Sequence, residues 1–193
     1  MFNVNGLPDF KIKPIGYLSE LCIKKQLYSF HTLCAFIYEL KYDRNDNKDD
    51  LGTVFTDNCG TCSTKHSLLK QVAEEQGFHD INLVLGIFKM NAINTAKISA
   101  VLFQYQLNYI PEAHNYLKYN HQIFDFTGPG FNPENYKTDI LDEINILPTQ
   151  ITQFKVTHHQ AFLKKWLAEN PLIQFNITEL WSIRENCIAA LSE

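Results

Sequence analysis

The sequence of 193 residues predicts an α+β domain, and three observations support this prediction. Apolar residues recur at spacings of three and four near both ends of the chain, which is the period of amphipathic helices. The middle of the chain contains a continuously apolar run and two alternating stretches, which are typical of strands. Hydrophobic residues make up 45% of the chain, so a core can form without disulfides or metals. We expect one domain with an N-terminal helical part (1–50), a core (51–147) and a C-terminal helical pair (148–193).

The first expected elements are helices. Residues 17–40 carry apolar side chains at helical spacing and predict one or two helices, with Cys22 and Cys34 packed on their apolar faces. Residues 41–50 are polar except for a single tyrosine and predict a surface connection. The segment 61–76 predicts the next helix, and a glycine stands where its C-terminal stop is expected.

Strands are expected in the centre of the chain. Residues 81–88 (I-N-L-V-L-G-I-F) predict a buried strand. Residues 95–108 fit either a helix or a strand, and their apolar positions favour a helix. Two alternating stretches, 113–118 and 122–127, predict a hairpin that G-P-G at 128–130 closes.

The loop of this hairpin decides which side chains meet. An even loop centred between Asn120 and His121 places His114, Tyr116 and Asp125 on one face of the sheet, with His114 and Asp125 as diagonal neighbours. An odd loop without a bulge places His114 and Asp125 on opposite faces. The turn therefore decides whether these two residues can pair.

The last third of the chain predicts two helices. Residues 156–169 have helical spacing and end before a proline, and His158 and His159 are expected on a solvated face of this helix. Asn176, followed three positions later by Glu179, predicts the cap of a final helix in which Cys187 packs inside.

Composition and charge exclude several classes of protein. A net charge of −4, with no Lys/Arg block longer than a pair, does not favour binding to nucleic acid. No apolar run approaches the roughly 18 residues that a membrane helix needs, and the N-terminus does not resemble a signal peptide. The odd number of cysteines, 5, favours a reducing compartment. We expect a soluble cytoplasmic protein that binds neither nucleic acid nor membranes.

Cys62 lies at or near the start of the 61–76 helix, in the sequence N-C-G-T-C-S-T-K-H. The N-terminus of a helix favours a thiolate over a thiol, and Lys65 and His66, one turn further on, could add positive charge. Such a cysteine is predisposed to be a nucleophile. The alternative is that Cys62 only packs, because Leu69 and Ala73 share its helical face.

Nucleophilic catalysis by cysteine needs a base near the sulfur and a third group that orients the base. A helix-start Cys62, followed by His114 in one strand and Asp125 in the next, supplies these roles in combination. Asn58 and the N–H of Cys62 are candidate donors to an oxyanion, and Tyr116 is a candidate substrate contact. Taken singly, a histidine in a strand more often has a purely structural hydrogen bond than a role as a base. An aspartate near a turn often only accepts hydrogen bonds from the backbone of that turn.

Three short motifs resemble the core of the transglutaminase-like cysteine enzymes, which are relatives of the papain-type fold. They are G-T-C at 60–62, H-N-Y-L at 114–117 and D-F-T at 125–127. The resemblance covers roughly residues 59–128. The family often has an aromatic residue after the nucleophile and a proline after the aspartate, where this chain has Ser63 and Phe126.

The resemblance implies a Cys-His-Asp triad, with Cys62 as nucleophile, His114 as general base and acid, and Asp125 as the orienting residue. It also implies that the helix carrying Cys62 packs on a small, mainly antiparallel sheet. Members of the family include transglutaminases, peptide and amide hydrolases such as cysteine proteases, and inactive proteins. We therefore expect acyl transfer from the amide or ester of a peptide, protein or small molecule, through a thioester at Cys62 and without a cofactor. The substrate, the choice between water and an amine as acceptor, and the oligomeric state stay open.

Three alternatives compete with this expectation. Cys59 and Cys62 form C-G-T-C at a helix start, which resembles the redox pair of thioredoxin-like proteins, although polar residues precede it instead of a buried strand. Cys59, Cys62 and His66, with His114 or His121, would suit zinc by residue type, but the second Cys-x-x-Cys pair of strong zinc patterns is missing. The third alternative is an inactive binding module of the same fold.

Overall fold

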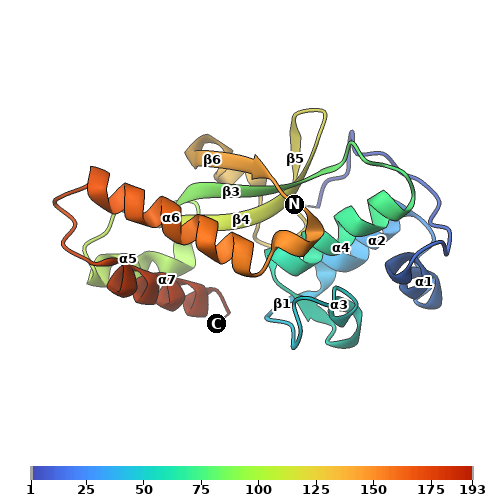
Figure 1. The fold of residues 1–193 in the computed structure, drawn as a ribbon, viewed down its shortest axis with the longest axis horizontal. Coiled ribbons are helices and arrows are strands. Elements are labelled where there is room, and N and C mark those ends of the chain that lie inside the picture. Colours follow the sequence, from blue (N-terminus) through green and yellow to red (C-terminus); the bar gives the residue numbers. More distant parts are fainter. Residues whose placement is uncertain (1, 193) are drawn as a thin grey trace.

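The computed structural model describes residues 2–192 and shows an α+β fold with helices gathered at both ends of a sheet (Figure 1). The helices are α1 (Tyr17–Lys24), α2 (Phe30–Glu39), α3 (Thr53–Thr56), α4 (Cys62–Glu75), α5 (Ser99–Gln104), α6 (Gln153–Glu169) and α7 (Ile177–Ser192). In Figure 1, α1 to α4 lie at the right end and α5 to α7 at the left end. The four helical segments predicted from apolar spacing, 17–40, 61–76, 95–108 and 156–169, are thus confirmed, the first as two helices.

The main sheet has four strands in the order β5-β4-β3-β6, and all neighbouring strands are antiparallel. A separate parallel pair joins β1 to β2. The strands are β1 (Lys41–Tyr42), β2 (Cys59–Gly60), β3 (Asn82–Asn91), β4 (Tyr109–Tyr119), β5 (Gln122–Phe124) and β6 (Ile140–Asn145). The predicted buried strand at 81–88 is confirmed as β3.

Two apolar clusters form the core, and β3 contributes to both. Its residues alternate, so that Leu83 and Leu85 belong to a cluster with α1, α2 and α4, while Val84 and Met90 belong to a cluster with α5, α6 and α7. This alternation follows from the two-residue period of a strand. The central strands therefore hold the two helical ends of the molecule together.

The hairpin of β4 and β5 has a two-residue loop, Asn120-His121, with φ angles of 45° and 64°. Positive φ at both positions is the geometry of a type I′ turn, which matches the twist of the paired strands. Tyr119 therefore pairs with Gln122, and the even-loop alternative is the one observed. The second strand is shorter than predicted, because β5 ends at Phe124 and Asp125 follows it.

Some features differ from the sequence predictions. Strand β6 was not predicted, because it is an edge strand whose exposure alternates between half-buried and exposed. The predicted surface connection 41–50 contains β1 and the buried Asn45, which accepts a hydrogen bond from Thr64 Oγ1 at 2.7 Å. The solvated position predicted for His159 is wrong: it is buried, and its Nε2 lies 2.9 Å from the carbonyl oxygen of Pro111.

The last helix, α7, begins with the cap that the sequence predicts. Asn176 Oδ1 accepts from the N–H of Thr178 and of Glu179, and Glu179 Oε2 accepts from the N–H of Asn176. This reciprocal pattern is a capping box, as the sequence predicted. Cys22, Cys34 and Cys187 are buried in the core, also as predicted.

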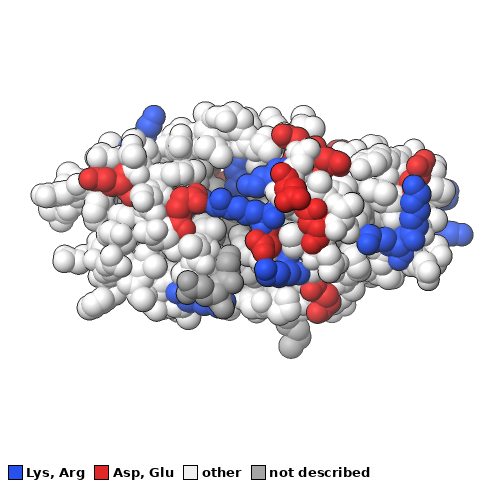
Figure 2. All heavy atoms as spheres, turned by 90° about the horizontal axis from the view of Figure 1, so that it is seen from below, with Lys and Arg blue, Asp and Glu red and all other residues white. Residues whose placement is uncertain are grey.

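Surface charges of both signs are interleaved on the face seen in Figure 2. Within residues 2–192, no helix is both long enough and apolar enough to cross a bilayer.

Gly86 lies opposite His114 in the β3–β4 register, and its position leaves no room for a side chain. A Cβ at Gly86 would lie 2.6 Å from Tyr116 Oη and 2.9 Å from a ring carbon of Tyr116. We predict that Gly86→Ala lowers the free energy of unfolding by about 1–3 kcal/mol, measured by urea titration, because the Tyr116 ring must shift. In a Tyr116→Phe background the same change should cost less, and an equal cost in both backgrounds would show that the clash is not the cause.

Candidate functional site

Cys62 is the first residue of α4, and its neighbours fix where this helix begins. Thr61 is the N-cap residue, and its N–H donates to Thr64 Oγ1 at 3.0 Å. The early N–H groups of a helix have no partner within the helix and give this end partial positive charge. The thiol of Cys62 therefore lies where a thiolate is favoured.

Asp125 is the centre of the hydrogen bonds around the site. Its side chain is 0% exposed, and His114 Nε2 lies 2.8 Å from Oδ2. Oδ2 also accepts from Tyr136 Oη at 3.0 Å, and Oδ1 accepts from the N–H of Thr127 at 2.9 Å. Burial opposes the charge of Asp125, but the charge and hydrogen bond of His114 hold its pKa well below the usual range.

His114 is oriented by this contact. Because Nε2 is directed at Asp125, Nδ1 is the ring nitrogen left for the sulfur of Cys62. Burial opposes the charge of His114, but the charges of Asp125 and Cys62 raise its pKa to about 10. The ring is therefore protonated at neutral pH, and in this state it can donate a proton.

The pKa of Cys62 moves in the opposite direction. Burial alone would raise it, but the charges of Lys155 and His114, and a hydrogen bond with His114, lower it to about 6. Cys62 and His114 thus form a thiolate–imidazolium pair between about pH 6 and pH 10, the two pKa values that bound this charge state.

His66 does not supply the positive charge expected from the sequence. Nε2 of this buried ring accepts the N–H of Phe126 at 2.7 Å, so Nδ1, 2.8 Å from the carbonyl oxygen of Cys62, is the donor of a neutral ring. Burial lowers the pKa of His66 to about 4. The role of His66 is to tie the first turn of α4 to the segment that follows Asp125.

Lys155 of α6 provides the cation instead. Its Nζ lies 3.7 Å from Cys62 Sγ, 2.9 Å from Ser63 Oγ and 2.8 Å from Asn115 Oδ1. No sequence motif marks this lysine, because it lies 93 residues after Cys62. The only hint in the sequence was Ser63, a polar residue at the position where the resembling family often has an aromatic residue. This side chain accepts a hydrogen bond from Lys155.

Cys62 and His114 line a cavity of about 300 Å³. Aromatic and aliphatic side chains form much of its wall, including Phe88, Phe131 and Ile188. Glu112 also lines it and is held by Arg184 through two hydrogen bonds, of 2.8 and 2.5 Å. Cys62 is thus part of the wall of this cavity.

Two predicted site residues do not belong to this cavity. Asn58 is exposed and is not among the residues that line the cavity, so the geometry does not support it as an oxyanion donor. Tyr116 is buried behind the site, and its hydroxyl donates to Glu143 on β6. Neither residue lines the cavity, and the roles of Asn58 as oxyanion donor and of Tyr116 as substrate contact stay predictions without geometric support.

Cys59 differs from Cys62 in its surroundings. Both are free cysteines, but Cys59 Sγ lies 3.9 Å from the carbonyl oxygen of Arg44. Burial, with the charges of Asp43 and Asp57, raises the pKa of Cys59. The thiol with the lowered pKa is Cys62, and this contrast favours a single nucleophile over a redox pair.

The zinc alternative receives no geometric support from residues 2–192, where no group of three or more His, Cys, Asp or Glu side chains is placed to hold a metal ion. His66 is engaged through both ring nitrogens, and His121 lies exposed in the hairpin turn.

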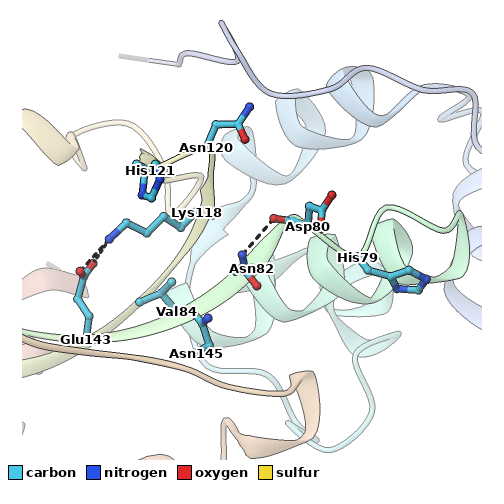
Figure 3. Close-up of a pocket in the computed structure, with 9 residues that line it drawn as sticks. All are labelled: His79, Asp80, Asn82, Val84, Lys118, Asn120, His121, Glu143 and Asn145. Atoms are coloured by element: carbon cyan, nitrogen blue, oxygen red, sulfur yellow. Dashed lines mark hydrogen bonds and ion pairs between the residues drawn. The ribbon is translucent and has the colours of Figure 1, made fainter.

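A second hollow, of about 610 Å³, lies over β3, β4 and β6 (Figure 3). Lys118 and Glu143 pair across it at 2.8 Å, and His79 and His121 lie apart from each other in the close-up. Although its volume is larger, its lining residues include no cysteine and no histidine whose ring is hydrogen-bonded to a carboxylate. The cavity at Cys62 is therefore the candidate active site.

Comparison with known proteins found no matching family model, no matching curated protein and no matching solved structure. The functional argument consequently depends on the geometry of the site.

The lowered pKa of Cys62 predicts selective alkylation. Iodoacetamide should modify Cys62 with an apparent pKa near 6, because the thiolate is present above this pKa and is lost as the pH falls through it. Peptide mass spectrometry across pH should show modification of Cys62 well before that of Cys59, and Cys59→Ser should leave the profile unchanged. A Cys62 profile centred near the ordinary thiol pKa of about 8.5 would contradict the assigned electrostatics.

Proposed function

We propose that this protein is a cysteine enzyme that transfers an acyl group from an amide or ester to Cys62, and then to water or an amine. The observation that carries the proposal is the hydrogen-bonded His114–Asp125 pair beside a thiol of lowered pKa in one cavity. The resemblance to transglutaminase-like enzymes, with their papain-type core, adds support, because it assigns the same roles to the same residues.

The first half of the reaction, the acylation of Cys62, uses the negative charge of the Cys62 thiolate and the proton on His114. The thiolate of Cys62 attacks the carbonyl carbon, a carbon–sulfur bond forms, and the carbonyl electron pair moves to oxygen. The N–H of Cys62, at the start of α4, is a donor available to this oxygen. When the tetrahedral intermediate collapses, the bond to the leaving amine or alcohol breaks, and His114 gives its proton to that group.

The second half regenerates the thiolate. His114, now neutral, removes a proton from water or an amine as it attacks the thioester, and the carbon–sulfur bond breaks. Asp125 holds the imidazole in one orientation and stabilises its protonated form during both halves. The same acyl-enzyme serves a peptidase, an amidase or a transglutaminase, and the acceptor decides between them.

The proposal predicts a covalent acyl-enzyme. Incubation with p-nitrophenyl acetate should release a burst of p-nitrophenolate and add one acetyl group at Cys62, detected by intact and peptide mass spectrometry. Cys62→Ser should abolish the adduct, whereas Cys59→Ser should not change it. Added hydroxylamine or glycinamide tests whether an amine competes with water as acceptor. Ready alkylation of Cys62 without any acyl adduct would identify an inactive module, and a titratable Cys59–Cys62 disulfide would favour redox chemistry.

The orienting role of Asp125 predicts a loss of rate without a loss of fold. Asp125→Asn keeps one oxygen, which can accept from the N–H of Thr127, but it places an amide NH2 toward Tyr136 and His114 and removes the charge that raises the pKa of His114. Acylation by the ester should slow on the order of 10²- to 10⁴-fold, and the alkaline limb of the pH–rate profile should move to lower pH. An unchanged alkaline limb would show that Asp125 does not set the ionisation of His114.

A further inference from the structure

Lys155 is a buried cation whose hydrogen bonds can be fully counted. Its exposure is 9%, and an ammonium has three N–H donors and no acceptor. A buried charge is tolerated when it is paired and hydrogen-bonded, so each of the three donors needs an acceptor. The structure supplies three acceptors: Ser63 Oγ, Asn115 Oδ1 and Cys62 Sγ.

Two of these acceptors are neutral and rigidly held. Ser63 Oγ donates to Asn115 Oδ1 at 3.0 Å, and Asn115 Nδ2 donates to the carbonyl oxygen of Val84 at 3.0 Å. These bonds orient the amide of Asn115 with its oxygen toward Lys155. The sulfur of Cys62 is therefore the one acceptor of the three that can carry a negative charge.

We propose that the charge of Lys155 is enough to keep Cys62 in the thiolate form even without His114, whose charge adds to the same effect. His114 and Asp125 are then free for a different task, the delivery of a proton to the leaving group. The first statement concerns the thiol alone, whereas the second rests on the acyl-transfer function proposed above. No proton moves to or from Lys155 in this scheme, because it acts as a fixed positive charge at a reacting atom.

Other titratable groups face Cys62 from the surrounding elements. Tyr42 of β1 and Tyr136 have pKa values raised chiefly by burial and stay neutral near pH 7. Lys48 and Lys65 are further cations whose charges interact with Cys62, and Lys65 Nζ donates to the carbonyl oxygens of Leu40 and Thr127. Glu112 on the cavity wall is compensated by Arg184. The remaining neighbours, His114 and Lys155, are the two groups that the experiment must separate.

The pH dependence of iodoacetamide alkylation at Cys62 separates them, measured in wild type, Lys155→Met, His114→Asn and the double variant. Lys155→Met should raise the apparent pKa of Cys62 by one unit or more, which slows alkylation at pH 6 by about fivefold or more. His114→Asn keeps a polar partner for Asp125 and should leave the apparent pKa below about 8.5, the ordinary value. The double variant should return to the ordinary value or rise above it, because only Lys48, Lys65 and the N-terminus of α4 then oppose the effect of burial.

Two further variants control for structural effects. Lys155→Arg retains the positive charge and should retain a lowered pKa, whereas Lys164→Met removes an exposed lysine of the same helix and should change nothing. The proposal is overturned if Lys155→Met, shown to be folded by circular dichroism, keeps the wild-type profile. It is equally overturned if His114→Asn alone restores the ordinary thiol pKa, a result that does not require Lys155→Met to fold.

Alkylation needs no substrate, so its result is independent of the acyl-transfer function. A profile that depends on Lys155, combined with no acyl adduct from any ester, would leave the assignment of Lys155 intact and remove the enzymatic proposal. An acyl adduct at Cys62, combined with an alkylation profile that Lys155→Met does not change, would support the enzymatic proposal and overturn the role of Lys155.

Discussion

The buried carboxylate of Asp125 is the constraint on which the candidate site depends. A charge without exposure must be compensated by hydrogen bonds and by an opposite charge, or the fold loses several kcal/mol. Asp125 obtains this compensation from His114 on β4, from the hydroxyl of Tyr136 and from the N–H of Thr127. These groups come from separate segments, so each segment must be in place before the carboxylate is stable. The same contacts orient the imidazole ring toward Cys62.

The charges around Cys62 balance as a set. Cys62 and Asp125 are the negative members, and His114 and Lys155 are the positive members. Removing any one of them leaves an uncompensated charge in a region of low dielectric, where electrostatic interactions are strong. This balance explains why a thiol at 6% exposure has a pKa below its ordinary value, although burial alone acts in the other direction. By contrast, Glu112 and Arg184 compensate each other on the cavity wall, which leaves their charges unavailable to the sulfur.

Much of the fold follows from local patterns in the sequence. Apolar spacing located the main helices, and the capping box at Asn176 marked the start of α7. Strand β6 escaped prediction because an edge strand with one half-buried face carries a weak apolar signal. In the site, local patterns placed Cys62 at the start of α4 and His114 on a strand. The same patterns predicted Asp125 inside the second strand of the hairpin, whereas β5 ends one residue before it.

The sequence by itself singled out Cys62, His114 and Asp125 as candidate site residues and predicted the local structure around each of them. The sequence did not determine whether the hairpin loop has an even or an odd number of residues. The structure shows a two-residue loop, Asn120-His121. Only the tertiary structure decided the charge of each group, because ionisation depends on burial and on neighbours that are distant in the chain. For this reason His66, one turn after Cys62, is neutral, while Lys155, from the far end of the chain, supplies the cation. The same long-range packing leaves Asn58 and Tyr116 outside the lining of the cavity, since proximity in sequence to Cys62 or His114 does not place a side chain in it.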